Sequence, residues 1–197
     1  MAVRAISAQS RLVSCRVVVG EAIVSAKSAL AHQPSHAGAK QMLVSLLIEE
    51  KRYPEVRAFL AEQLEAQPDQ PSLAMTLARI TLETGDTGGA ISVLQRHAAA
   101  GAQSAPYRGF AAGLLQKAGR HQEAIEEFRA ATDLAPRTGA YWIGMGTSQE
   151  ALGEDAKAVE SYRRAQKSLG LTPTALRTVQ ARLDRLGPSA EEAPVAA

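Results

Sequence analysis

The chain has 197 residues and carries 22 Lys and Arg against 20 Asp and Glu, a formal net charge of +2. Because the basic residues are spread along the chain, they form no concentrated region of the kind that attracts nucleic acid. The single Cys cannot close an internal disulfide, and with four His it supplies no ligand set for structural zinc. No stretch approaches the roughly 18 consecutive apolar residues of a membrane-spanning helix, so we expect no membrane span in this chain.

Alanine is the commonest residue, and the alternating Val, Ile and Thr pattern that marks β-strands is scarce. We therefore expect an all-α protein. Small side chains let two helix backbones approach closely, which favours a tightly packed array of helices.

A repeat with a period of about 34 residues runs along the chain. Starting from Gly119, Ala124 and Phe128, a shift by one period in either direction meets residues of similar type. The matching sets are Gly153, Ala158 and Tyr162 further along, and Gly85, Ala90 and Leu94 before it. The prolines on one phase of this period are Pro34, Pro68 and Pro136. A period of this length predicts stacked units of two helices each.

Small residues recur at two places in each unit, where its two helices are expected to cross. On the first helices they are Ala78, Ala112 and Gly146, and on the second helices Ala90, Ala124 and Ala158. The larger residues one turn further along the second helices are expected to fill the core between units: Leu94, Phe128 and Tyr162. The residues expected to end the first helices with positive φ are Gly85, Gly119 and Gly153.

These positions predict a partial repeat at 21–36 and four full repeats at 37–70, 71–104, 105–138 and 139–172. A helix at 174–187 is expected to cap the array, since its apolar residues share one face: Leu176, Val179, Leu183 and Leu186. We expect a disordered tail at 188–197. Residues 1–20 do not match the missing first helix of the partial repeat, because Gln9 and Ser10 stand at its apolar and small positions. An irregular or truncated start is expected there, and truncation of a longer chain is favoured.

No residue pattern indicates catalysis. The chain lacks the nucleophile-elbow, Walker, zinc-protease and dinucleotide-binding motifs. His32 and His36 have the spacing of metal ligands on one helix, but Pro34 between them would break that helix. Glu126 and Glu127 are expected to be solvated rather than to act as a general acid and base. We therefore expect no enzyme, no metal site and no cofactor.

The repeat resembles the tetratricopeptide repeat, whose motif is matched best by Trp142, Met145, Gly146, Ala158 and Tyr162. The resemblance implies a right-handed α-solenoid that binds a protein or peptide partner in a concave groove lined by the first helices. The groove-facing positions that it implies are Gln41, Ser45, Met75, Arg79, Gly109, Gly113, Ile143 and Thr147. Relatives that clamp a terminal carboxylate place Lys, Asn and Arg there. Only Arg79 fits that pattern, so no carboxylate clamp is expected.

Gly109 and Gly113 are two glycines expected inside one helix, where together they cost roughly 1.5–2 kcal/mol relative to alanine. Close approach by the backbone of a bound partner and tight packing within the array both explain them, and the sequence does not decide between the two. Alanine at both positions is expected to raise stability, and to weaken binding only if the partner explanation holds.

The stretch from about 30 to 187 also resembles the repeat domain of biogenesis proteins for mannose-sensitive-haemagglutinin type IV pili in bacteria. The matching phrases include 123–128, 141–146 and 150–153, followed by the helix from Leu176 to Leu186. This resemblance implies an accessory role in pilus assembly, with pilus-assembly components as partners and the repeats held in the periplasm by an N-terminal membrane helix. We expect no such helix within this sequence, so localisation stays open: periplasmic if the full-length protein carries an upstream membrane anchor, and cytoplasmic otherwise.

The alternative is a cytoplasmic adaptor or regulatory protein that binds a peptide or helix in the same groove. The repeat arm of an enzyme such as a transferase ranks third, because no catalytic domain is present. Partner identity, self-association and oligomeric state stay open.

Overall fold

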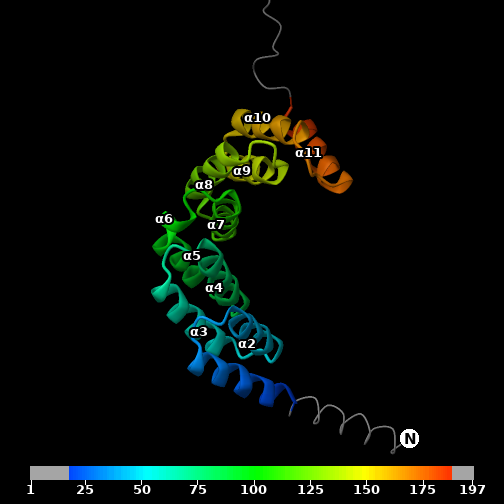
Figure 1. Ribbon diagram of the computed structural model, residues 1–197. Helices are drawn as coiled ribbons and strands as arrows, with labels where there is room; N and C mark the ends of the chain where they lie inside the picture. The colour runs from blue at the N-terminus through cyan, green and yellow to red at the C-terminus, as the bar shows by residue number, and fades with distance from the viewer. Residues whose placement is uncertain (1–17, 188–197) are drawn as a thin grey trace, which may run out of the picture. The chain divides into compact units, whose positions relative to one another are not determined.

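A computed structural model of the chain describes residues 18–187. Its regular elements are helices, and one isolated bridge joins Thr138 and Leu169 (Figure 1). The expectations for residues 1–17 and for the tail at 188–197 lie outside the described residues. Among the described residues, no helix combines the length and the apolar character needed to cross a membrane.

The expectation of an irregular segment at 1–20 is wrong for residues 18–20. These residues are helical and continue into the helix that ends at residue 32. Val19 lies one turn before Ile23 on the same face, and Ile23 and Ala26 are both buried. The helix therefore extends into the segment that was expected to be irregular, with Val19 half-buried.

The chain divides into two compact units, Met1–Ala61 and Glu62–Ala197. Unit 1 contains the helix at 18–32, α2 (Ala37–Glu49) and most of α3 (Tyr53–Ala66), which crosses the boundary. The helices of unit 2 are α4 (Pro71–Glu83), α5 (Thr87–Arg96), α6 (Ala98–Gly101), α7 (Ala105–Lys117), α8 (His121–Leu134), α9 (Gly139–Ala151), α10 (Asp155–Gln166) and α11 (Pro173–Leu186).

Helix pairs in unit 2 cross at the small residues that the sequence singled out. The alanines at the crossings have no exposed surface: Ala78, Ala90, Ala112, Ala124 and Ala158. At Gly146 a Cβ would lie 2.8 Å from Cε1 of Tyr162, closer than packed carbon atoms allow. The larger residues Leu94, Phe128 and Tyr162 are buried, as predicted. Small side chains at each crossing therefore leave room for the bulky core residues beside them.

The short helix α6 was not predicted from the repeat. It follows directly after α5, and its last residue, Gly101, is buried beside Tyr107. A Cβ on Gly101 would overlap the Tyr107 ring. The Tyr107 hydroxyl donates a hydrogen bond of 2.6 Å to the Leu94 carbonyl. This hydrogen bond joins α7 to the C-terminal part of α5. The chain between the two helices passes through α6, whose last residue packs against the Tyr107 ring.

Helix α11 is held to the preceding pair by the carboxylate of Glu150, a side chain only 14% exposed. This carboxylate accepts hydrogen bonds of 2.7 Å from Arg182 and 3.0 Å from the Tyr162 hydroxyl, and it also pairs with Arg185. The predicted cap is therefore fixed by charge as well as by Val179, which is completely buried.

The turns between first and second helices share one backbone conformation. Gly85, Gly119 and Gly153 have φ of +83°, +75° and +73°, as predicted. At Gly119 the amide bonds to the Gln116 carbonyl, and the next amide bonds to the Leu115 carbonyl. Lys51, which lies one period before Gly85, makes the same turn with φ of +55° and equivalent hydrogen bonds to Ile48 and, through Arg52, to Leu47.

We predict opposite effects for two reciprocal substitutions at these turns. Lys51→Gly should raise the free energy of unfolding by about 1 kcal/mol, because a side chain at positive φ is strained. Gly119→Ala should lower it by a similar amount for the same reason. Urea unfolding followed by circular dichroism measures both, and changes of the same sign in the two variants would contradict the account.

Candidate partner-binding surface

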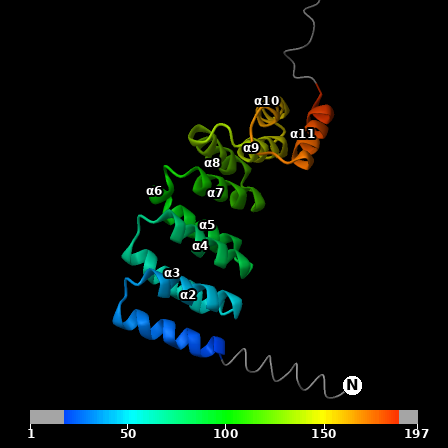
Figure 2. The same ribbon diagram turned by 45° about the vertical axis from the view of Figure 1, so that its right-hand side comes forward.

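The first helices of the pairs in unit 2 lie along one side, and the second helices lie along the other. Helices α4, α7, α9 and α11 follow one another along one side, and α5, α8 and α10 lie along the other (Figure 1, Figure 2). Helix α7 packs against both α4 and α9. The expected groove residues of unit 2 define what we call the first-helix face: Met75, Arg79, Gly109, Gly113, Ile143 and Thr147.

Two of the expected groove residues, Gln41 and Ser45, belong to unit 1. Both are exposed on α2, one turn apart on the same helix face.

Helix α4 contributes the one charged residue of the first-helix face, Arg79. This residue is exposed, and its guanidinium carbon lies 5.2 Å from the centre of the Phe110 ring on α7. The contact is a cation–π interaction, which holds the arginine against the neighbouring helix. Met75 lies half-buried one turn earlier on α4. On α4, the first-helix face therefore consists of the apolar Met75 and of Arg79, whose position is held by the Phe110 ring.

The structure separates the two glycines of α7. A Cβ on Gly109 would overlap the ring of Tyr141 from α9, so packing within the array accounts for this glycine. Burial raises the pKa of Tyr141, which keeps its phenol neutral. At Gly113 an added Cβ would meet nothing within 4 Å, and the residue is exposed. For Gly109 the contact with the Tyr141 ring indicates the opposite of the expected effect, namely that alanine lowers stability.

The α9 part of the face is fixed by hydrogen bonds. The Thr147 hydroxyl donates to the Ile143 carbonyl at 2.9 Å and lies 3.3 Å from the Tyr162 hydroxyl. Gln116, one turn after Gly113, donates to the Gly144 carbonyl at 2.8 Å and to the Ser148 hydroxyl at 2.7 Å. Gln116 was missed by the sequence analysis, although its spacing from Gly113 puts it on the same helix face. It ties α7 to α9 directly beside the open position at Gly113.

The described residues contain no group of three or more His, Cys, Asp or Glu side chains that could hold a metal ion. The helix containing His32 ends at that residue, and α2 begins at Ala37. His36 caps α2 instead, since its Nδ1 accepts a hydrogen bond of 3.1 Å from the Ala39 amide. The two histidines are therefore not neighbours on one helix.

Two models of the tetratricopeptide repeat match the chain, at residues 19–80 and 111–175, and together they span more than half of it. No curated protein matches.

Solved structures of tetratricopeptide-type proteins resemble the chain. A crystal structure of MamA protein is 18% identical with a TM-score of 0.64, covering 81% of this chain and 92% of its own. A MamA structure from Desulfovibrio magneticus RS-1 is 17% identical with a TM-score of 0.61, covering 80% and 91%. YrrB, described as a TPR protein with an unusual peptide-binding site, is 20% identical with a TM-score of 0.65, covering 86% and 88%. These likenesses confirm the predicted all-α fold of the tetratricopeptide type.

We predict that the two glycines of α7 respond oppositely to alanine. Gly113→Ala should raise the free energy of unfolding by about 0.5–1 kcal/mol, because alanine favours the helix and meets no neighbour. Gly109→Ala should lower it by about 1 kcal/mol, because displacing the Tyr141 ring outweighs the gain in helix propensity. Urea unfolding followed through Trp142, the only tryptophan, measures both. Stabilisation by both substitutions would contradict the packing explanation for Gly109.

Proposed function

This chain belongs to the tetratricopeptide repeat family, and we propose that it is a non-catalytic scaffold whose first-helix face binds a polypeptide partner. Two features support the proposal. The residues on this face are a cation, small residues and neutral side chains, which suit binding better than acid–base chemistry. YrrB, a protein of similar fold, is described as having a peptide-binding site.

The observation that best supports the proposal is an exposed glycine inside helix α7, Gly113, which no neighbouring side chain requires. A glycine inside a helix costs about 1 kcal/mol relative to alanine, and no neighbour within unit 2 requires it here. Its absent side chain leaves the α7 backbone open on the first-helix face. A peptide or helix backbone that approaches α7 at this point would account for the glycine.

The surroundings of Gly113 favour a partner that docks without large rearrangement. Gln116 and Thr147 are held by hydrogen bonds, and Arg79 is held by the Phe110 ring. Side chains that are already ordered lose little conformational entropy on binding, which favours affinity.

At a finer level, we propose that the partner is a component of type IV pilus assembly, and that the chain is an accessory factor in pilus biogenesis. Support comes from the sequence phrases at 123–128 and 141–146, which resemble the repeat domain of such biogenesis proteins. The repeats would then lie in the periplasm. The alternative, a cytoplasmic adaptor, would use the same face for another partner.

Quantitative affinity capture from the native host tests both levels of this proposal. The tagged chain, Gly113→Ala and Gly88→Ala are each used as bait in lightly cross-linked cells. Gly88 is a matched control, because it also lies in a helix with nothing within 4 Å of an added Cβ, but on the second helix α5. We predict that Gly113→Ala recovers the partner about five- to tenfold less than the other two baits, as expected for roughly 1–1.4 kcal/mol of lost binding.

The proteins that Gly113→Ala loses identify the partner. Pilus-assembly components among them would support the pilus proposal. If the lost proteins were cytoplasmic enzymes or chaperones, the pilus proposal would be wrong and the adaptor alternative would stand. Equal recovery of every protein by all three baits would contradict the role of the first-helix face.

A further inference from the structure

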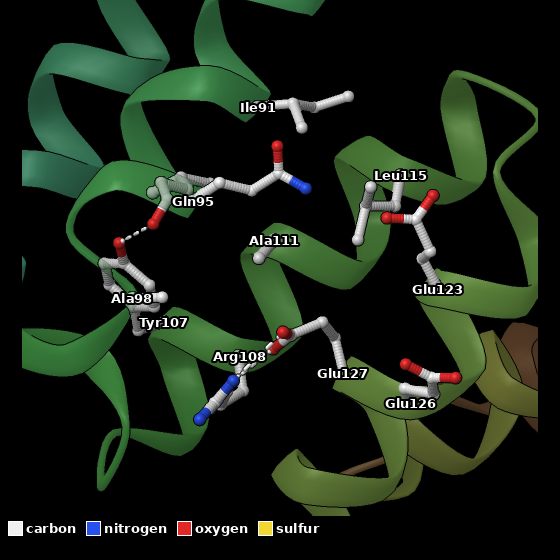
Figure 3. A pocket seen from close by; sticks show the side chains of 11 residues that line it. Ile91, Gln95, Ala98, Tyr107, Arg108, Ala111, Leu115, Glu123, Glu126 and Glu127 are labelled. Atoms are coloured by element: carbon white, nitrogen blue, oxygen red, sulfur yellow. Dashed lines mark hydrogen bonds and ion pairs between the residues drawn. The ribbon is translucent and has the colours of Figure 1, made fainter.

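Unit 2 has a hollow of about 100 Å³ on the opposite side of α7, between α5, α7 and α8 (Figure 3). This volume is well above the roughly 10–15 Å³ that one water needs, and it gives room for a side chain. The floor is apolar, formed by Ile91 and Leu94 of α5 and by Ala111 and Leu115 of α7. Figure 3 shows Ala111 at the centre, with the other helices around it.

Three carboxylates from α8 line the hollow: Glu123, Glu126 and Glu127. Arg120 holds Glu123 with hydrogen bonds of 2.7 Å and 2.5 Å, and Arg108 holds Glu127 with bonds of 3.0 Å and 2.9 Å. Glu126 is exposed and has no ion pair with any described residue. Three carboxylates against two guanidinium groups leave an excess of one negative charge beside an apolar floor.

The remaining residues that line the hollow, Gln95, Ala98 and Tyr107, carry no charge. The Tyr107 hydroxyl is occupied by its bond to the Leu94 carbonyl. Burial, with the nearby Glu127 carboxylate, raises the pKa of Tyr107 to about 12, so the phenol carries no charge at neutral pH. The hydrogen bonds from Arg120 lower the pKa of Glu123, which keeps that carboxylate ionised. The charge of the hollow therefore stays negative.

We propose that this hollow binds a Lys or Arg side chain of a protein partner. Lysine and arginine combine an apolar stem with a cationic end, which matches the apolar floor and the acidic rim. The stem would lie on Ile91 and Leu115, and the cation would meet the Glu126 carboxylate. Since Arg108 and Arg120 fix the other two carboxylates in place, the rim is already ordered before the cation arrives.

The hollow and the first-helix face are separate sites. Ala111 follows Gly109, and Leu115 follows Gly113, by two residues, and two residues turn an α-helix by about 200°. The two pairs therefore lie on opposite sides of α7. The inference does not rest on the proposed function, and either one can fail without the other.

The test is a titration of methyl-labelled protein, read by NMR at Ile91, Leu94 and Leu115. The first probe is acetyl-Ala-Lys-Ala-amide, and its matched control replaces lysine by norleucine, which keeps an apolar stem but has no ammonium group. We predict saturable shifts of these methyls that need about five- to tenfold less of the lysine peptide, and a difference that shrinks in high salt.

Protein variants locate the binding. Glu126→Gln should remove most of the preference for lysine, whereas Glu83→Gln, another exposed carboxylate but outside the hollow, should leave it unchanged. Ala111→Leu should fill the hollow and abolish the shifts. If that variant does not fold, Glu126→Gln still decides, because it changes one exposed group.

Three results would overturn the proposal. Equal binding of the two peptides would make the hollow a plain apolar site. Shifts only outside the methyl groups of Ile91, Leu94 and Leu115, or no saturation over the soluble range of the peptides, would show that the hollow takes no side chain. Spermidine binding more tightly than the lysine peptide at the same methyls would assign the hollow to a free polyamine instead of a protein partner.

Discussion

The close crossing of two helices at small side chains is the constraint on which unit 2 depends. Ala112 and Ala124, with no exposed surface, let α7 and α8 approach until Phe128 can pack beside them. A larger residue at either position would separate the helices and expose that core, at a cost of about 1–3 kcal/mol. Because the crossing recurs in the successive repeats of unit 2, the first helices of this unit line up on one side and its second helices on the other, and each side becomes a continuous surface.

Helix α7 contributes residues to both proposed binding sites, the first-helix face and the hollow. Its Gly113 side is open, whereas its Ala111 side borders a hollow with acidic residues. Rigid packing between these sides means that a partner on one does not have to disturb the other. Under both proposals, one chain would bind two polypeptides at once.

The sequence predicted what depends on residues at a fixed spacing. The period identified the helix order, the alanines at the crossings and the positive φ of Gly119, because each of these is decided within one repeat. It could not decide between the two explanations for Gly109, since the deciding neighbour is the Tyr141 ring on α9 in the following repeat. It also did not predict α6, whose last residue, Gly101, packs against the Tyr107 ring. The hollow was also missed. Glu126 and Glu127 were expected only as a solvated pair, because the sequence does not show that α5 and α7 place an apolar floor beside them.

Amide hydrogen exchange on the chain with and without its captured partner tests the central claim most directly. Binding on the first-helix face should slow amide exchange in α7 around residues 109–116 and in α9 around residues 143–147, where this face lies. Unchanged exchange in both segments, with protection confined to the second helices α5, α8 and α10, would contradict the claim that the first-helix face is where the partner binds.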